Sequence, residues 1–369
     1  MKQKILFILH IPPPINGAAM VGQYIKESSV INTAFDADHV NLATSFQLGD
    51  IGKGGYNKVI ATFKILKLVY EALKTKKYDL CYLTLTAKGA GFYKDFLVVL
   101  LLKLKGQRII YHFHNKGVSQ NSRNVLNHLL YKITFRNAQC IQLSPLLYKD
   151  IAKYVAQKDV QYCPNGVEEF PNTHKKNVDL EKVRPCRLLF LSNMMEEKGV
   201  WDLLDACCQL KKRELDFECH FIGAWSDVKE GNFKAKVRNL ELEKLVYAHG
   251  KKYGEDKNTY FYNSDIFVFP TYYHNECFPL VLLEAMQFSL AVVSTNEGGI
   301  ADIVEHGQTG LLVEKNNIKE LVSALEYLIL NPKIRNRMGK EGYLRYKNSF
   351  TKEVFENNLK NILKRAIHS

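Results

Sequence analysis

The sequence predicts an α/β protein made of two Rossmann-like domains, each built around a parallel sheet. Short apolar runs alternate with helix-length segments along the whole chain, a pattern typical of βαβ units. The length of 369 residues exceeds one ordinary core and fits two domains of usual size. A polar stretch that contains the turn dipeptide Asn165-Gly166 interrupts the alternation near the middle.

The expected elements fall into two series. The first has strands at residues 5–10, 80–85, 108–112, 139–143 and 160–163. The second has strands at residues 187–192, 217–222, 245–249, 266–269, 291–294 and 310–313. The clearest helices are expected at residues 56–76, 125–136, 200–212 and 318–330.

These series set the expected domain boundaries. Residues 1–165 form the first domain, 166–186 a linker, and 187–350 the second domain. Apolar residues at helical spacing in 351–369 predict a one-sided terminal helix that packs back on the first domain. Because ligands bind at the carboxyl ends of parallel strands, we expect the two domains to face a central cleft that holds the active site.

Cysteine usage and apolar runs suggest a cytoplasmic protein. The chain has eight cysteines, none in a C-x-x-C pair and most within apolar runs, which favours a reducing compartment and no structural zinc. The apolar stretch ILFIL near the N-terminus is short for a secretory signal. The longest uninterrupted apolar run, residues 96–102, is far shorter than a membrane span. The expected location is therefore the cytoplasm, with peripheral membrane contact at most.

Positive charge is concentrated in the N-terminal half. Residues 1–170 hold 22 Lys and Arg against 11 Asp and Glu, whereas the remainder holds 29 against 27. Lysines predominate, and apolar residues interleave with them in 89–106. This favours an anionic membrane surface as a partner, the alternative being a plain solvated face. Nucleic-acid binding would also explain the charge, but the chain has no recognisable motif for it, so none is expected.

The stretch 265–313 is the most informative part of the sequence. Glu276 follows a strand that ends at Pro270, and Glu284 is expected in the second turn of a helix that opens near Phe278. The N–H groups at such a helix start point at an anion, and the two carboxylates can accept hydroxyl groups of a sugar. The pair alone is weak evidence, since two solvated glutamates at this spacing are common.

With its surroundings, this stretch resembles the donor-binding signature of retaining family 4 glycosyltransferases, which have the GT-B fold. The matching residues are Pro270, Thr271, Glu276, Glu284, Gly298, Gly299, Asp302, Gly307, Thr309 and Gly310. The resemblance implies that Glu276 holds hydroxyls of the donor sugar and Glu284 grips the ribose. It also implies that the backbone N–H groups of Phe278 and Leu280 contact the diphosphate.

The phosphate-binding part departs from the family pattern at several positions. Cys277 stands where the family often has glycine, and Pro279 supplies no N–H. A second loop, LSNMMEEKG, resembles the family's G-R-x-x-x-x-K-G loop, with Lys198 matching the lysine that clamps the diphosphate. Asn193 stands in place of the arginine and cannot supply its charge. Gly250 ends a strand where the family has its base-binding loop.

The N-terminal half contributes two weaker candidates. Asn16, Gly17 and Ala18 open a helix after the first strand, and small residues there allow close approach of a ligand. The resemblance places this loop against the donor phosphate and the acceptor, the alternative being a plain connection. The resemblance also places a histidine beside the transferred sugar, and His114 matches it best, whereas His112 is expected to be a packed strand residue. Two histidines without a carboxylate or cysteine do not make a zinc site.

The resemblance implies a retaining, metal-independent hexosyltransferase with His114, Lys198 and Glu276 as catalytic residues and no cofactor. It would move a hexose or N-acetylhexosamine from a UDP- or GDP-sugar to a glycan acceptor in bacterial surface polysaccharide synthesis, such as capsule, O-antigen or exopolysaccharide. A polyprenyl-diphosphate-linked acceptor is preferred over a soluble one. Two alternatives stay open: a sugar-nucleotide epimerase of the same fold, and a non-catalytic partner subunit.

Overall fold

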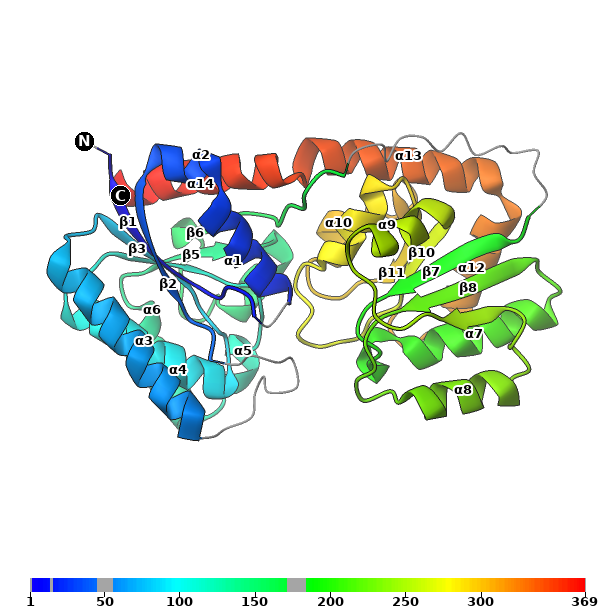
Figure 1. The fold of residues 1–369 in the computed structure, drawn as a ribbon, viewed down its shortest axis with the longest axis horizontal. Helices are drawn as coiled ribbons and strands as arrows, with labels where there is room; N and C mark the ends of the chain where they lie inside the picture. Colours follow the sequence, from blue (N-terminus) through cyan, green and yellow to red (C-terminus); the bar gives the residue numbers. More distant parts are fainter. Residues whose placement is uncertain (1, 14–15, 45–55, 171–183, 369) are drawn as a thin grey trace. The chain divides into compact units, whose positions relative to one another are not determined.

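The computed structural model describes residues 2–13, 16–44, 56–170 and 184–368. The chain divides into two compact units (Figure 1). Unit 1 comprises Met1–Gly166 with Lys352–Ser369, and unit 2 comprises Val167–Thr351. Each unit contains one six-stranded sheet, and every strand pair in both sheets is parallel. The predicted class, an α/β protein with two parallel sheets, is confirmed.

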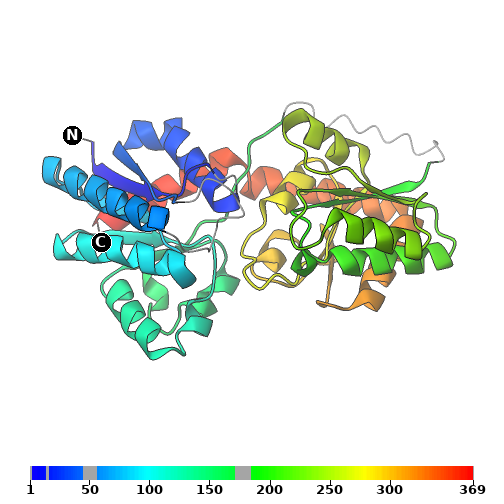
Figure 2. The ribbon, with the colours of Figure 1, turned by 60° about the horizontal axis from the view of Figure 1, so that its bottom comes forward.

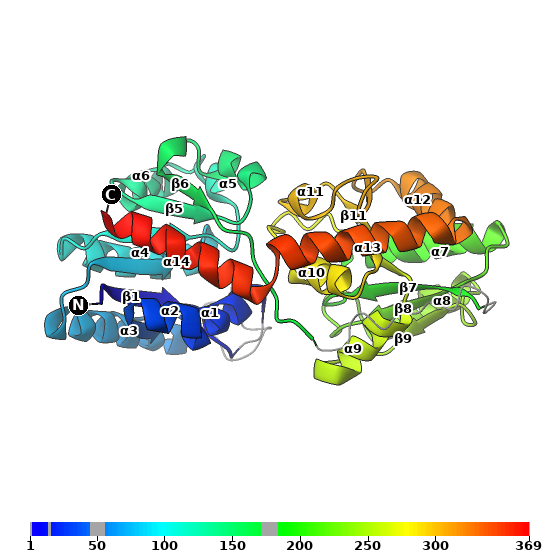
Figure 3. The ribbon, with the colours of Figure 1, turned by 90° about the horizontal axis from the view of Figure 1, so that it is seen from above.

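Unit 1 has its strands in the order β2-β1-β3-β4-β5-β6. The strands are β1 (Lys4–Leu9), β2 (Asp36–Asn41), β3 (Leu80–Thr84), β4 (Ile109–His112), β5 (Gln139–Gln142) and β6 (Val160–Tyr162). The helices are α1 (Gly17–Glu27), α2 (Ser29–Ala34), α3 (Tyr56–Thr75), α4 (Gly89–Leu104), α5 (Val118–Asn121), α6 (Val125–Phe135) and α14 (Lys352–His368). Helices α3, α4 and α6 pack on the sheet over one hydrophobic core, and α2 and α14 lie side by side away from them (Figures 1 and 3).

One strand of unit 1, β2, was not predicted. Its sequence DADHVN is polar, and Val40 is its only buried residue. It lies at the sheet edge, where β1 is its one partner strand among the described residues. An edge strand needs no continuous apolar run, so the hydrophobic pattern that predicts the other five strands is missing here.

Unit 2 has its strands in the order β12-β11-β10-β7-β8-β9. The strands are β7 (Cys186–Leu191), β8 (Phe217–Ile222), β9 (Val246–Ala248), β10 (Ile266–Phe269), β11 (Ala291–Thr295) and β12 (Gly310–Val313). The helices are α7 (Val200–Lys212), α8 (Glu230–Asn239), α9 (Gly254–Asn263), α10 (Leu280–Gln287), α11 (Ile300–Ile303), α12 (Ile318–Leu330) and α13 (Pro332–Ser349). All six strands lie within a residue or two of the predicted ranges.

The start of the expected linker, 166–186, is part of unit 2. The backbone N–H of Val167 donates to the carbonyl of Phe350 at 3.0 Å. The N–H of Phe170 donates to the side-chain oxygen of Gln287 at 3.1 Å. These bonds hold the chain against unit 2 immediately after it leaves unit 1, and most of the remaining linker lies outside the described residues.

The terminal helix α14 belongs to unit 1. It buries the residues that the sequence places on its apolar side, namely Phe355, Leu359, Ile362, Leu363 and Ala366. The Arg108 guanidinium donates to the backbone carbonyl of Ala366 at 3.4 Å. The helix is thus tied to the start of β4 by a side chain as well as by packing. None of the helices in the described ranges combines the length and the apolar character needed to cross a bilayer.

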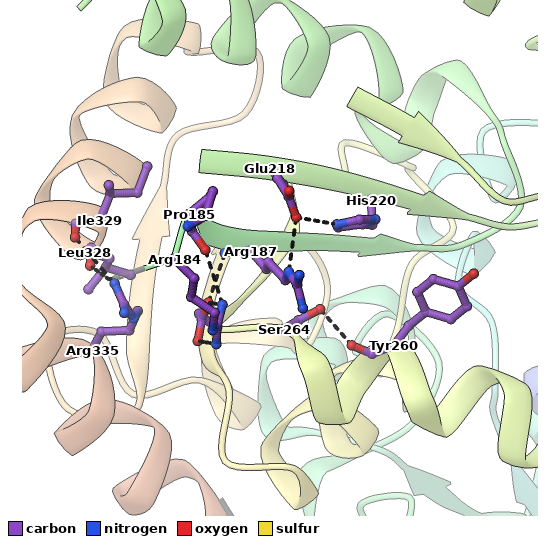
Figure 4. A network of polar contacts seen from close by, with 11 residues as sticks. Arg184, Pro185, Arg187, Glu218, His220, Tyr260, Ser264, Leu328, Ile329 and Arg335 are labelled. Atoms are coloured by element: carbon purple, nitrogen blue, oxygen red, sulfur yellow. Dashed lines mark hydrogen bonds and ion pairs between the residues drawn. The ribbon is translucent and has the colours of Figure 1, made fainter. Parts of the chain in front are cut away.

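Each sheet has one point where the strand order reverses. In unit 1 it lies between β1 and β3, and in unit 2 between β7 and β10. Ligands of open α/β sheets bind beside such a switch point, at the carboxyl ends of the strands. Arg184 lies at the opposite, amino edge of the unit 2 sheet (Figure 4). It forms two bonds to Asp265 at 2.7 and 2.8 Å, which tie the start of β7 to that of β10.

Candidate functional site

The loops after β7 and β10 are fixed against each other at the switch point of unit 2. Gly199 has φ +84°, and a Cβ there would lie 2.3 Å from the carbonyl oxygen of Pro270. The N–H of Tyr272 donates to the carbonyl of Glu197 at 2.8 Å. Only glycine tolerates both this φ and this approach, so the backbone brings the two loops into direct contact.

This contact joins two of the predicted residues, Lys198 and Glu276. The Lys198 Nζ lies 2.5 Å from a carboxylate oxygen of Glu276. Their side chains are only 13% and 11% exposed. The same Nζ lies 4.4 Å from the ring centroid of Tyr273 and 5.4 Å from that of Phe269. The ammonium is therefore positioned by a carboxylate and two aromatic rings in a region with little water, where its charge is weakly screened.

The loop after β11 supports the backbone of Glu276 from the other side. Gly298 has φ +59°, and a Cβ there would lie 2.3 Å from the Glu276 carbonyl oxygen. The N–H of Gly299 donates to the carbonyl of Cys277 at 2.7 Å. The two glycines of the signature thus pack under the loop that carries Glu276. Cys277 is buried and is absent from the described non-glycine residues with positive φ, so the backbone there does not require glycine.

Helix α10 begins at Leu280, two residues later than the expected opening near Phe278, because Pro279 is its N-cap residue. The Phe278 side chain is buried and its ring centroid lies 5.7 Å from that of Phe350. This packing fixes the backbone before the helix. The first turn of an α-helix leaves N–H groups without partners inside the helix, so Leu280 lies where an anion would be bound.

Glu284, the second carboxylate of the pair, is bound by a lysine that sequence reasoning missed. The Nζ of Lys257, on α9, lies 2.7 Å from a carboxylate oxygen of Glu284. The two side chains are 18% and 16% exposed. A lysine within a helical stretch gives no sequence signal for such a contact. Each of the two predicted carboxylates, Glu276 and Glu284, is thus paired with a lysine.

Asn193 and Gly250 lie on neighbouring loops at the same edge of the sheet. Asn193 is exposed, and Gly250 has φ +66°. Gly223, after β8, joins these loops: its N–H donates to the carbonyl of Gly250 at 2.9 Å. A Cβ on Gly223 would lie 1.7 Å from the carbonyl oxygen of Ser192. Sequence reasoning missed Gly223, although a glycine directly after a strand is a signal of close backbone approach.

The loop after β1 places the predicted acceptor-side residues of unit 1 at the start of α1. The Asn16 side chain caps this helix by accepting from a first-turn N–H at 3.0 Å. Gly17 is exposed and Ala18 is half-buried. Gly22 was missed: a Cβ there would lie 2.0 Å from the carbonyl oxygen of His10. The sequence signal for Gly22 was its position inside a predicted helix. Glycine destabilises a helix interior, so a glycine there suggests that the backbone is closely approached by another segment.

His114 lies after β4, at the carboxyl edge of the unit 1 sheet. Its ring centroid is 4.3 Å from that of His112, which is fully buried and lies 2.5 Å from the hydroxyl of Tyr82. The His114 Nδ1 is buried and has no hydrogen-bond partner among the described residues. Burial, with a smaller contribution from the charge of His10, lowers the pKa of His114 to about 3. His114 is thus neutral at physiological pH and offers a hydrogen bond rather than a charge.

His10 is a neighbouring titratable group that sequence reasoning missed. Burial, followed by the charge of Lys94, lowers the pKa of His10 to about 4. The one sequence signal for a functional role of His10 was its position at the end of the first predicted strand. His114 and the loop of Asn16 belong to unit 1, whereas Lys198 and Glu276 belong to unit 2.

The described residues include no group of three or more His, Cys, Asp or Glu side chains arranged to hold a metal ion. The one D-x-D sequence at a strand, Asp36 and Asp38 on β2, lies at the amino edge of the unit 1 sheet. Lys76 binds both carboxylates at 2.8 Å. These aspartates therefore link β2 to the chain after α3.

Two parallel α/β sheets, with a lysine–glutamate pair at the switch point of one, define a protein of the GT-B class. Residues 172–345, which lie within unit 2, match the family model described as Glycosyl transferases group 1. The resemblance found in the sequence is confirmed.

The curated relatives match only part of the chain, whereas a solved structure matches almost all of it. An uncharacterized glycosyltransferase of Haemophilus influenzae is 31% identical over 47% of this chain and 48% of its own length. The capsular polysaccharide biosynthesis glycosyltransferase CapM of Staphylococcus aureus is 26% identical over 45% and 42%. The chain thus spans about half the length of these relatives or less. An Anabaena protein solved in complex with UDP shares the fold, with a TM-score of 0.73, 17% identity, and coverage of 98% and 100%.

Proposed function

We propose that the chain is a retaining, metal-independent hexosyltransferase that acts at the cytoplasmic side in bacterial surface polysaccharide synthesis. Its donor is a UDP- or GDP-sugar and its acceptor a lipid-linked glycan. The observation that carries the proposal is the ion pair between Lys198 and Glu276, 2.5 Å long and largely buried, at the switch point of a parallel sheet. An ammonium and a carboxylate held together there match the two parts of a nucleotide-sugar, its diphosphate and its sugar hydroxyls.

In this proposal the donor exchanges the partners of the pair. Lys198 turns from the carboxylate to the diphosphate, together with the backbone N–H groups of Phe278 and Leu280 at the start of α10. Glu276 is then released to accept hydrogen bonds from the sugar hydroxyls. Charge-assisted bonds of this kind are shorter and stronger than neutral ones. Without donor, the pair keeps both groups compensated and close to their working positions.

The reaction breaks the bond between the anomeric carbon and the diphosphate oxygen and forms one between that carbon and the acceptor oxygen. The acceptor proton passes to the leaving diphosphate on the same face of the sugar, which retains the anomeric configuration. Lys198 and the helix N–H groups stabilise the negative charge that develops on the leaving group. The neutral imidazole of His114 supplies a hydrogen bond beside the transferred sugar. In this scheme fixed protein charges meet the diphosphate, so no metal ion is needed.

Glu284 is proposed to bind the ribose hydroxyls of the nucleotide. Its contact with Lys257, 2.7 Å long, holds the carboxylate in position and compensates its charge. Asn193 supplies no charge where the family has arginine, so Lys257 is a second cation near the nucleotide that the family signature does not include.

The pathway and donor class are supported by what is known of similar proteins. The relative from Staphylococcus aureus is named for capsular polysaccharide biosynthesis, and the Anabaena protein was solved with UDP. A polyprenyl-diphosphate-linked acceptor is consistent with the excess of basic residues in the N-terminal half, 22 against 11 acidic ones in residues 1–170.

The first test is a thermal-shift screen of the purified chain against UDP-, GDP- and ADP-sugars. A ligand at about 100 times its Kd stabilises the native state by about 2.7 kcal/mol. The matching donor should then release nucleoside diphosphate only when a lipid-linked acceptor is added, with or without a metal chelator. Glu276→Gln should abolish this release.

The outcomes separate the competing functions. Release without acceptor would indicate an epimerase-type reaction, and stabilisation without any release would indicate a non-catalytic partner. Loss of release on chelation would refute metal independence. The proposed site would be wrong if Glu276→Gln turned over at the wild-type rate.

A further inference from the structure

Three helices of unit 1 form one continuous outer layer, α3, α4 and α6. Helix α4 packs between the other two, and Figure 2 shows α3 and α4 side by side in blue and cyan. The Tyr93 hydroxyl donates to the side chain of Asn127 at 2.8 Å, which joins α4 to α6. The Nζ of Lys105 lies 4.8 Å from the ring centroid of Tyr70, which joins the end of α4 to α3. We call the solvent side of this layer the α3–α4–α6 face.

The α3–α4–α6 face is apolar where a surface helix is normally polar. On α4 the exposed stripe at helical spacing consists of Tyr93, Leu97, Leu100 and Leu104, with Leu104 77% exposed. Of the 21 large hydrophobic side chains exposed in the described residues, 14 lie on these three helices. The others on this face are Tyr56, Val59, Ile60, Phe63, Leu68, Tyr70, Val125, Leu126, Leu129 and Ile133. Exposed apolar side chains concentrated on one layer of helices in this way mark an interaction surface.

The same face is strongly basic. The three helices carry seven lysines: Lys58, Lys64, Lys67, Lys74, Lys94, Lys103 and Lys132. Their two acidic residues are Glu71, which is exposed, and Asp95, whose buried carboxylate lies 3.0 Å from the Lys94 ammonium. Because the Lys94 and Asp95 side chains are only 12% and 0% exposed, this pair contributes little to the surface. Of the other charged side chains of these helices, six are lysines and one is acidic, Glu71, which lies 3.7 Å from the Lys67 ammonium.

We infer that the α3–α4–α6 face docks on an anionic phospholipid bilayer. A surface that combines lysines with exposed leucines and aromatic rings is typical of proteins that bind the membrane interface. In such surfaces the apolar side chains enter the headgroup region and the ammonium groups bind lipid phosphates. A second copy of the chain fits poorly, because two such faces would bring like charges together. Nucleic acid would satisfy the lysines but would leave the aliphatic stripe of α4 in water.

This inference deepens the proposed function and rests on its lipid-linked acceptor. A unit that binds the bilayer would reduce the search for a membrane-embedded acceptor to two dimensions. The face involves none of the residues assigned to donor or acceptor binding, so docking and sugar transfer can be tested separately.

The test is sedimentation of the full chain with vesicles in the absence of any nucleotide-sugar. Vesicles of phosphatidylglycerol and phosphatidylcholine in equal parts are compared with pure phosphatidylcholine, at low and high salt. We expect binding to the anionic vesicles only, weakened by salt. Lys64→Gln, Lys67→Gln and Lys74→Gln should each lower the partition coefficient about fivefold. The triple variant L97Q/L100Q/L104Q should lower it about tenfold or more.

The matched control is L330Q/L344Q, which changes two exposed leucines of unit 2 and should bind as the wild type does. Circular dichroism checks that every variant is folded. The inference is refuted if the wild type ignores anionic vesicles, if both sets of face variants bind normally, or if the α4 variant instead converts a dimer to a monomer. A chain that binds vesicles but transfers no sugar would refute the proposed function and leave docking intact.

Discussion

Breaking the pair between Lys198 and Glu276 should affect stability and turnover in different ways, which separates a structural pair from a catalytic one. Lys198→Met leaves a carboxylate that is only 11% exposed without its cation. Removing one partner of a fully buried pair costs about 3 to 5 kcal/mol, and the remaining exposure places the expected loss near the lower end, about 3 kcal/mol. Glu276→Gln keeps a hydrogen-bond acceptor and should cost about 1 to 2 kcal/mol.

The double variant K198M/E276Q removes both charges, so no group is left uncompensated. Its stability should recover to within about 1 kcal/mol of the wild type, which gives a coupling free energy of about 2 kcal/mol or more. Turnover should not recover, because each of the three variants lacks the ammonium that stabilises the leaving group, the carboxylate that binds the sugar hydroxyls, or both. Loss of one such preorganised group lowers kcat about 100- to 1,000-fold.

Both tryptophans of the chain, Trp201 and Trp225, lie in unit 2. Urea unfolding followed by tryptophan fluorescence therefore reports the stability of the unit that holds the pair. Release of nucleoside diphosphate reports turnover on the same samples. Recovery of both stability and turnover in K198M/E276Q would refute the catalytic role, and additive losses of stability would refute the ion pair itself.

Two further predictions concern Lys257, which only the structure identified, and the two histidines His10 and His114. Lys257→Met should raise the KM for the donor about tenfold with little change in kcat. The reason is that the substitution frees the Glu284 carboxylate, which is proposed to bind the ribose and not the leaving group. Equal effects on kcat and KM would contradict this role of Lys257. The pKa values of His10 and His114 are lowered to about 4 and about 3, so between pH 6.5 and 4 the unfolded chain binds protons that the folded chain does not. The free energy of unfolding of unit 1 should fall with pH by up to about 1.4 kcal/mol per unit per histidine, as measured by circular dichroism. This slope should become smaller in H10Q/H114Q without vanishing, because burial also lowers the pKa of His112.

The strands could be predicted where burial on both faces demands a continuous apolar run. The sequence of β10, IFVF, is buried at every position, and its bounds were predicted correctly. The edge strand β2 was missed because one neighbour and one buried residue suffice for it. The other edge strands, β6, β9 and β12, were predicted, so β2 was missed because it lacks an apolar run and not merely because it lies at an edge.

The parts of the candidate site that could be predicted are those at strand ends. Lys198 and Glu276 each follow a strand within a recognisable motif, so each was a candidate before their contact was known. That they meet depends on β7 and β10 being neighbours, which no local pattern encodes. Lys257 could not be predicted, because its role depends on a contact between α9 and α10.

The uneven charge of the two halves follows from two different uses of lysine. In unit 2 the lysines beside the signature are fixed by carboxylates: Lys198 by Glu276, Lys257 by Glu284, and Lys315 by Glu297 at 2.7 Å. A lysine that binds one phosphate group at one place needs a fixed position. The carboxylate that holds the lysine there also cancels its charge, so such lysines add little to the net charge of unit 2.

A cation that meets a diffuse anionic surface needs no fixed position and therefore no such partner. Lys64 and Lys74 of the α3–α4–α6 face follow this second rule: both are exposed on a helix whose only acidic residue, Glu71, lies beside Lys67. On this inference, the excess of positive charge in the N-terminal half follows from membrane docking, and the near balance in the C-terminal half follows from binding of one ligand at a fixed place. If neutralising the face left vesicle binding unchanged, this explanation of the charge distribution would fail even with a fully active transferase.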